Sequence, residues 1–263
     1  MLNFCSLYSG STGNCLLVSS EDTNILIDAG VSQKKIIEGL ESINKDINKI
    51  DAILVTHEHS DHIMSIGGLS KKYNIPVYSN NETLHAMTSQ IDKIDENNRK
   101  IFNIGDKFNI GSLEIKPFAT PHDAANPCGF NIMKDNKKIS IATDIGHIDD
   151  DLINNLKNSS FIMLESNYDP EILRLCHYPY RLKQRISGLN GHLSNSSAGK
   201  AISTLIPSGL YKVMLGHLSK ENNFPELAYK TVVEEINLKG FKEKDININV
   251  ASRNNPTDII KIS

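Results

Sequence analysis

Short apolar runs, alternating or continuous, recur along the first part of the chain and predict β-strands. The first three, at 4–8, 15–18 and 24–28, are separated by turn formers and predict an antiparallel meander. Further strands are expected at 50–56, 100–104, 113–119, 130–133 and 138–142, and helices at 33–40 and 82–90. The second part predicts strands at 161–164 and 212–215 and helices at 196–206 and 225–238. Two strand-rich halves covered by helices predict an α/β (α+β) fold, a four-layer αββα sandwich, in one domain of residues 1–263.

The composition is that of a soluble globular protein and excludes several classes. The chain has 263 residues, 39% of them hydrophobic, and a formal net charge of −3. It contains no run of about eighteen apolar residues, and its start lacks a basic segment followed by an apolar one. Its four cysteines form no Cys-x-x-Cys pair, which favours reduced thiols over a disulfide framework or a zinc ribbon. We therefore expect a cytoplasmic protein that does not enter a membrane.

The charged residues are unevenly distributed along the chain. The interval from Ile172 to Lys220 contains no Asp or Glu but seven Lys or Arg residues, so the rest of the chain carries a charge of −10. A basic surface on an otherwise acidic protein can attract a polyanion such as nucleic acid. An ordinary solvated surface is an equally good interpretation of this pattern alone.

The most specific motif is the run His57-Glu58-His59-Ser60-Asp61-His62. It follows the buried strand expected at 50–56, and the apolar residues after it suit one face of a helix. A loop at the carboxyl end of a strand is where α/β folds place their chemistry. Imidazole nitrogens and carboxylate oxygens at close spacing bind ions such as Zn, Mn or Fe. The motif therefore predicts a metal site rather than a His-rich surface loop.

Other side chains that can bind metal come directly after other predicted strands. These are His122, Asp144 and His217. One edge of a sheet can present them together. Asp28 ends the third strand in the same way, and we expect it to hydrogen-bond a ligand and fix its orientation. The turn at 9–14 has two glycines that could bring backbone amides to an anion, although a plain hairpin turn also accounts for them.

In these motifs the chain resembles the metallo-β-lactamase superfamily. The superfamily's five motifs match, in the expected order, Asp28, the run from His57 to His62, His122, Asp144 and His217. The resemblance implies a four-layer αββα sandwich of the metallo-β-lactamase type that binds two divalent metal ions, Zn, Mn or Fe. It also implies which residues bind each ion: His57, His59 and His122 the first, Asp61, His62 and His217 the second, and Asp144 both. Asp61 would thereby belong to the catalytic centre as well.

The stretch from His192 to Asn222 narrows the resemblance to one branch. This region contains Gly191-His192-Leu193-Ser194, then a predicted helix, then the strand that ends at His217. The pattern is similar to that of the tRNase Z and phosphodiesterase branch. That resemblance implies that His192 contacts the scissile phosphate and assists the leaving group, and that Glu165 steadies His192. The alternatives are a His192 that only caps a helix and a Glu165 that is only solvated.

Several motifs are together similar to the YycJ/WalJ group: residues 9–14, 56–62, 165–169 and 216–223. These are bacterial cytoplasmic proteins regarded as DNA exonucleases linked to mismatch repair. The resemblance implies a nucleic-acid partner, DNA. Four basic residues between the Glu165 and His192 motifs are candidates to follow the nucleic-acid backbone: Arg174, Arg181, Lys183 and Arg185. Tyr168, Tyr178 and Tyr180 could stack on a base, although packing explains them equally well.

The expected reaction is hydrolysis of a nucleic-acid phosphodiester bond. Two cations bound together lower the pKa of a bridging water, and the hydroxide attacks phosphorus without a Ser or Cys nucleophile. His192 would supply a proton to the departing oxygen. A small thioester, lactone or cyclic phosphodiester is an alternative substrate for the same centre. A non-catalytic nucleic-acid-binding regulator that uses the metal structurally is the alternative without an enzyme.

Overall fold

The computed structural model describes residues 1–262, which divide into two compact units. The first unit contains Met1–Ala119, Ala124–Lys137 and the segment that begins at Ser252. The second unit contains Thr120–Asp123 and Lys138–Ala251. The expected single domain of residues 1–263 stays a prediction.

The strands of the first unit are β1 (Leu2–Tyr8), β2 (Cys15–Ser19), β3 (Asn24–Ile27), β4 (Ala52–Leu54), β5 (Val77–Ser79), β6 (Arg99–Ile101), β7 (Phe108–Ile110), β8 (Leu113–Ala119), β9 (Cys128–Lys134) and β14 (Ile260–Ile262). Seven of them form a sheet in the order β14-β1-β2-β3-β4-β5-β6. β1, β2 and β3 are antiparallel, as the meander predicts, and β3 to β6 run parallel. β7, β8 and β9 pair antiparallel with one another. The carboxyl ends of β3 and β4 therefore lie side by side.

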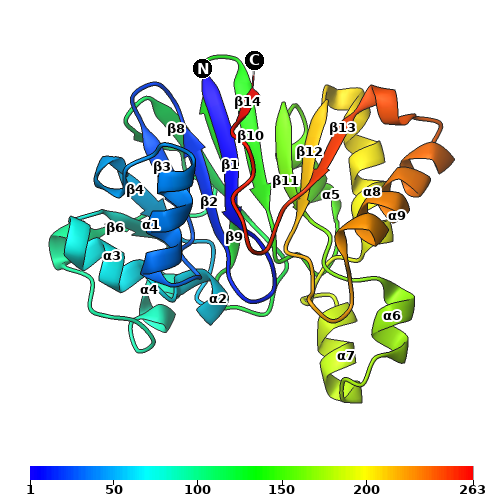
Figure 1. The fold of residues 1–263 in the computed structure, drawn as a ribbon, viewed down its shortest axis with the longest axis horizontal. Coiled ribbons are helices and arrows are strands. Elements are labelled where there is room, and N and C mark those ends of the chain that lie inside the picture. Colours follow the sequence, from blue (N-terminus) through cyan, green and yellow to red (C-terminus); the bar gives the residue numbers. More distant parts are fainter. Residues whose placement is uncertain (263) are drawn as a thin grey trace. The chain divides into compact units, whose positions relative to one another are not determined.

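The helices of the first unit are α1 (Gln33–Ser42), α2 (Ser60–Ile63), α3 (Ile66–Tyr73) and α4 (Asn81–Met87). They lie beside the sheet in Figure 1 and contribute to one apolar core with the strands. α1 begins where the Ser32 hydroxyl accepts a hydrogen bond from the backbone N–H of Lys35. Its apolar face buries Ile36 and Leu40 in that core. Burial of such faces is the main force that holds the helices on the sheet.

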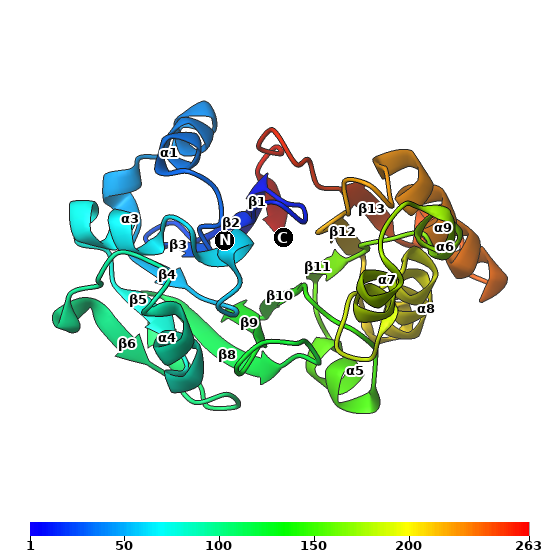
Figure 2. The ribbon, with the colours of Figure 1, turned by 90° about the horizontal axis from the view of Figure 1, so that it is seen from below.

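The second unit contains the strands β10 (Lys137–Ala142), β11 (Phe161–Glu165), β12 (Lys212–Gly216) and β13 (Asn247–Val250). Its helices are α5 (Asp150–Leu156), α6 (Pro170–Leu175), α7 (Tyr180–Ser187), α8 (Asn195–Leu205) and α9 (Pro225–Leu238). The four strands are parallel neighbours in chain order. α8 packs against α9, while α6 and α7 lie apart at the lower end of this unit in Figure 1, the side that faces the viewer in Figure 2. The parallel strands again gather their carboxyl ends at one edge.

Most elements predicted from the sequence are present with small shifts at their ends. The helix expected at 225–238 is α9, and the helix expected at 196–206 is α8, one residue earlier. The strand expected at 100–104 is β6, which covers only Arg99–Ile101. The sequence analysis did not predict α5, α6 and α7, which are only six to eight residues long. The expected mixed α/β composition is confirmed.

Candidate active site

In the first unit, β3 and β4 deliver two of the predicted site residues to the same sheet edge. Ile27 is the register partner of Leu54, so Asp28 and the segment that leads to His57 leave the sheet together. The backbone N–H of Asp28 donates to the carbonyl of Leu54 at 2.8 Å. Asp28 has a φ of 60°, in the left-handed region that few residues other than glycine adopt. Such backbone strain is characteristic of functional sites.

The buried Asp28 carboxylate organises the histidine loop. Its Oδ1 accepts a hydrogen bond from the backbone N–H of Thr56 at 2.9 Å, and its Oδ2 accepts the Thr56 hydroxyl at 2.8 Å. The Nδ1 of His62 donates to Oδ2 at 2.7 Å. The Nδ1 of His57 in turn donates to the Thr56 hydroxyl oxygen at 2.9 Å. Because both Nδ1 atoms carry the proton in this network, the Nε2 atoms of His57 and His62 are left as ligand atoms.

The ligand atoms of the first unit lie close to the spacing that one metal ion requires. His57 Nε2 and His59 Nδ1 are 3.1 Å apart, and Asp61 Oδ2 and His62 Nε2 are 3.4 Å apart. Two ligands that bind one tetrahedral ion at roughly 2.0–2.2 Å lie about 3.3–3.6 Å from each other. The Asp61–His62 pair falls within this range, and the His57–His59 pair lies slightly below it.

Asn14 lies beside these metal-ligand candidates of the first unit, and the sequence analysis did not identify it as a site residue. Its side-chain amide nitrogen lies 3.3 Å from Asp61 Oδ2 and 3.1 Å from His62 Nε2, while its Oδ1 accepts the backbone N–H of Gly10. The turn at 9–14 joins β1 and β2, so it is a hairpin turn that also supports the metal-binding run. Gly30 completes the support, because a Cβ there would lie 1.5 Å from the carbonyl oxygen of Asp61. The only available signal was the glycine-rich turn itself.

In the second unit, three neighbouring strand ends carry the other site residues. Ala142 pairs with Leu164, and Glu165 pairs with Gly216 in the parallel register. Asp144, Glu165 and His217 therefore emerge at one edge. Asp144 and His217 have φ values of 58° and 55°, the same strained conformation as Asp28. A left-handed histidine is uncommon and indicates that packing and hydrogen bonds hold it in place.

Glu165 is fully buried and accepts four hydrogen bonds. Its Oε1 accepts from His192 Nδ1 at 2.8 Å and from His217 Nδ1 at 2.7 Å. Its Oε2 accepts the backbone N–H groups of Ile145 at 2.8 Å and Leu193 at 3.1 Å. Burial opposes ionisation of this carboxyl, but the charge and hydrogen bonds of the two imidazoles outweigh burial and hold its pKa well below the usual range. The alternative of a solvated Glu165 is therefore wrong.

His192 is held by Glu165 and is not a helix cap. The cap of α8 is Ser194, whose hydroxyl accepts the backbone N–H of Ser197. Burial disfavours the charged form of His192, but the Glu165 carboxylate outweighs it and raises the pKa of the imidazole. With Nδ1 donating to Glu165, the proton that His192 can give away is the one on Nε2.

Asp144 lies between two imidazoles of the second unit. Its Oδ1 is 3.7 Å from His122 Nε2 and 3.6 Å from His217 Nε2. His122 Nδ1 donates to the carbonyl of Gly191 at 2.9 Å, and His217 Nδ1 donates to Glu165, so both Nε2 atoms are ligand atoms. These spacings suit a carboxylate and two imidazoles that share bound ions.

Both units therefore bury side chains whose desolvation needs compensation. His57, His62, His122, Asp144 and His217 are all buried, and only His59 and Asp61 are half-buried. Burying so many imidazoles and carboxylates costs free energy unless they are hydrogen-bonded or bind metal. Their donor set of imidazole nitrogen and carboxylate oxygen suits Zn, Mn or Fe.

Comparison with known proteins shows the family of this chain. Residues 23–217 match the model of a β-lactamase superfamily domain. The chain is 40% identical to the exodeoxyribonuclease WalJ of Streptococcus pneumoniae over 232 residues, which cover 88% of this chain and 86% of WalJ. It is 39% identical to the exodeoxyribonuclease YycJ of Bacillus anthracis over 240 residues, 91% of each protein. This chain belongs to the β-lactamase superfamily, in the family of WalJ and YycJ.

A solved structure shows the same fold at lower sequence identity. The metallo-β-lactamase fold protein YhfI from Bacillus subtilis superposes with a TM-score of 0.72 at 16% identity, over 97% of this chain and 98% of YhfI. The expected metallo-β-lactamase-type fold and the expected kinship with the YycJ/WalJ group are therefore confirmed. Membership of this family also confirms the expectation of a hydrolase. No helix among residues 1–262 is long and apolar enough to cross a membrane.

Three of the four basic residues predicted to bind substrate have partners within this β-lactamase superfamily chain. Arg174 pairs with Glu171 at 2.7 Å, and the Lys183 ammonium donates to the carbonyl of Arg174 at 2.7 Å. Arg185 binds Asp123 in a bidentate ion pair, at 2.5 and 3.0 Å. The fourth, Arg181, is exposed on α7.

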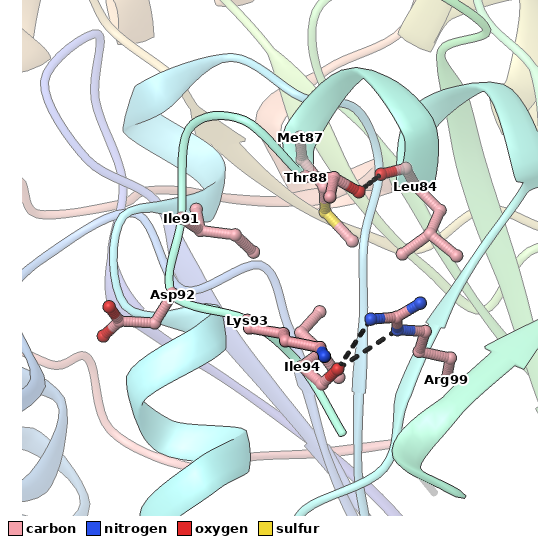
Figure 3. A pocket seen from close by; sticks show the side chains of 8 residues that line it. All are labelled: Leu84, Met87, Thr88, Ile91, Asp92, Lys93, Ile94 and Arg99. Atoms are coloured by element: carbon pink, nitrogen blue, oxygen red, sulfur yellow. Dashed lines mark hydrogen bonds between the residues drawn. The ribbon is translucent and has the colours of Figure 1, made fainter. Parts of the chain in front are cut away.

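A pocket of the first unit lies apart from these residues. It has a volume of about 250 Å³ and is shown in Figure 3. It is lined mainly by apolar side chains of α4 and the segment that follows it, and the Arg99 guanidinium donates there to the carbonyl of Ile94. None of the predicted site residues lines it. The metal-binding candidates and this pocket are therefore separate features.

Proposed function

We propose that this protein is a dinuclear metal-dependent phosphodiesterase that acts as a DNA exonuclease. The observation that carries the proposal is the shared Glu165 carboxylate. One oxygen of Glu165 holds both His217, a metal-ligand candidate, and His192, which lies outside the proposed ligand set. A metal-binding imidazole and a proton-donating imidazole are thereby fixed by the same group, as hydrolysis with a poor leaving group requires. The family relatives named exodeoxyribonucleases support DNA as the substrate.

The proposed ligand sets combine the residues described above. His57, His59 and His122 would hold the first ion, Asp61, His62 and His217 would hold the second, and Asp144 would serve both. Two divalent ions, Zn, Mn or Fe, would supply an activated water and neutralise charge on the phosphate. The contribution of the chain is to hold each ligand atom in position, through Asp28 and Thr56 in the first unit and through Glu165 in the second.

His192 is the proposed general acid. Its Nδ1 is fixed by Glu165, so its Nε2 can hold a proton for the departing oxygen. The pKa of His192 is raised above its ordinary value by the Glu165 carboxylate, against the effect of burial. A larger protonated fraction near neutral pH follows, which suits an acid.

The proposal of DNA as the substrate is supported by the distribution of basic residues and by the names of the relatives. The proposed contacts to the DNA backbone are Arg174, Arg181, Lys183 and Arg185. They lie in the interval from Ile172 to Lys220, which contains no acidic residue. The protein is proposed to act in the cytoplasm, where its four thiols would remain reduced.

Digestion of end-labelled single- and double-stranded DNA and RNA tests the proposal directly. We expect stepwise shortening of DNA with Mn, Mg or Zn, no shortening with chelator, and about two transition-metal ions per chain by elemental analysis. Asp144→Ala should lower metal content and activity together, because one carboxylate serves both ions. His85→Ala is the matched control, since His85 is an exposed histidine of α4. A protein that binds a single ion and cleaves no phosphodiester would refute the proposal.

A further inference from the structure

A cluster of buried amide and hydroxyl side chains joins the segments that carry the site residues of the second unit. Its members come from the end of β11 just after Glu165, from the start of α8 just after His192, and from the loop that follows His217. Two of these segments lie in the motifs 165–169 and 216–223, to which the proposed reaction gives no role beyond Glu165 and His217. The members of the cluster are Ser166, Asn167, Asn195 and Asn223, and all four are buried.

Asn223 connects the three segments to one another. Its amide nitrogen donates to the backbone carbonyls of Ser166 at 2.9 Å and Asn167 at 3.1 Å. It also donates to Oδ1 of Asn195 at 2.8 Å, and the amide nitrogen of Asn195 donates back to Asn223 Oδ1 at 3.1 Å. The Ser166 hydroxyl donates to the same oxygen of Asn195 at 2.6 Å. Because buried amides cost free energy unless they are hydrogen-bonded, a cluster bonded in this way holds its segments in one arrangement.

Asn167 is the member of the cluster that bonds directly to the segments of both histidines. Its side-chain amide donates to the backbone carbonyl of His217 at 2.7 Å. Its backbone N–H donates to the carbonyl of Leu193, the residue after His192, at 2.8 Å. Its own carbonyl accepts the backbone N–H of Ser219 at 2.8 Å. Only the first of these bonds uses the side chain, so a substitution at this position removes the bond to His217 and keeps the backbone bonds.

The bond to the His217 carbonyl holds a strained residue. His217 has a φ of 55°, a conformation that costs a residue with a side chain free energy. The Asn167 amide binds its backbone, and Glu165 binds its Nδ1. The imidazoles of His192 and His217 thereby lie with their centroids 5.3 Å apart. If His217 relaxed from this conformation, its imidazole would leave this position, because the Cα–Cβ bond turns with φ.

We propose that Asn167 is a positioning residue of the hydrolase, whose amide holds His217 in the left-handed conformation from which Nε2 binds a metal ion. This inference rests on the proposed function and adds to it a residue outside both the ligand set and the proposed acid. Hydrogen bonds that orient a metal ligand typically change metal affinity by about 10- to 100-fold when they are removed. A residue that served only the stability of the second unit would change the free energy of unfolding and leave metal affinity as it is.

The test measures the zinc affinity of the full chain by competition with a chromogenic chelator. Asn167→Asp keeps the shape of the side chain but places an accepting oxygen, in place of the donating NH₂ group, against the His217 carbonyl. Asn167→Ala removes the donor without adding a charge. In both variants we expect one zinc ion to bind about 10- to 100-fold more weakly and the other to keep its affinity. In the His217→Ala background, the same substitutions should leave the affinity of the remaining ion unchanged.

Ser159→Ala is the matched control for a loss of stability without a loss of positioning. Ser159 is buried just before β11, at the opposite end of that strand from the site, and its hydroxyl donates to the carbonyl of Leu156 at 2.7 Å. This variant should lower the urea midpoint in chelator and leave both zinc affinities unchanged. The same behaviour in both Asn167 variants would overturn the inference, and so would equal weakening of the two ions.

Turnover of bis(p-nitrophenyl) phosphate gives a second readout. In Asn167→Ala it should recover as the zinc concentration is raised, because the weakened site is then filled. A loss of turnover that persists at saturating zinc would mean that Asn167 acts on the substrate, and would overturn the positioning role.

Failure of this inference is distinguishable from failure of the proposed function, because the zinc titration needs no turnover. DNA shortening by the unaltered protein, together with normal zinc affinity in both Asn167 variants, removes only the role of Asn167. An unaltered protein that binds zinc but cleaves no phosphodiester removes the exonuclease, while weaker zinc binding by the Asn167 variants would still support the positioning of His217. An unaltered protein that binds no metal removes both.

Discussion

Replacing Glu165 by glutamine tests whether this carboxylate holds His192 and His217 in place. The carboxylate accepts two imidazole N–H groups on one oxygen and two backbone N–H groups on the other. A glutamine has one accepting oxygen, so its NH₂ group must face two buried donors in either orientation. Two hydrogen bonds to a charged acceptor are lost, each worth about 1.5–3 kcal/mol. We expect Glu165→Gln to lower the free energy of unfolding by about 3–6 kcal/mol, a large part of the roughly 5–15 kcal/mol typical of a domain.

The assay is urea unfolding followed by circular dichroism in the presence of chelator. Chelator removes the contribution of metal binding, which would otherwise add to the stability of both proteins. With a urea slope of about 2 kcal/mol/M, the midpoint should fall by about 1.5–3 M. Glu171→Gln is the matched control, because Glu171 is exposed and pairs with Arg174 on the surface. Surface pairs of this kind contribute about 0–1 kcal/mol, so the control midpoint should hardly move.

A midpoint shift below about 0.5 M in Glu165→Gln would contradict this reasoning. It would mean that the imidazoles and backbone amides find other partners, and that Glu165 does not hold His192 and His217 in place. The same preparation should also show lower turnover with metal, since misplaced ligands and a misplaced acid both slow hydrolysis.

Three further predictions concern other parts of the chain. His192→Ala should lower turnover by roughly 10²- to 10⁴-fold with metal content unchanged, and loss of metal would instead make His192 a ligand. Gly30→Ala should destabilise the protein by about 3 kcal/mol or more, because the new Cβ would lie 1.5 Å from the backbone carbonyl oxygen of Asp61. Urea unfolding measures this change, and an unchanged midpoint would refute the contact. Cys176 should react with a thiol reagent at pH 8 before Cys15 and Cys128 do. Burial raises the pKa of Cys15 and Cys128 well above the usual value and leaves little thiolate. Equal reaction rates of these thiols in the folded protein would contradict the burial of Cys15 and Cys128.

Several features of the site could be predicted from the local sequence. The run from His57 to His62 combines an apolar strand before it with closely spaced ligands, and both signals lie within a few residues. Asp28, Asp144 and His217 each come at the end of a predicted strand or directly after it, where α/β folds place their catalytic and binding residues. Recognising the strands was therefore enough to predict these positions. α9 was predicted with its exact bounds because it has proline in its first turn and a long periodic pattern.

Contacts between residues far apart in the sequence were decided only by the tertiary structure. Asn14 meets Asp61 and His62 because a hairpin turn packs behind the histidine loop, and no local pattern encodes that approach. Arg185 pairs with Asp123, 62 residues away, a contact that no local pattern predicts. The exposure of Tyr180 also depends on what packs around it. Sequence determined which side chains could do chemistry, whereas the fold determined which of them are held, paired or left at the surface, because those properties depend on neighbours that only folding brings together.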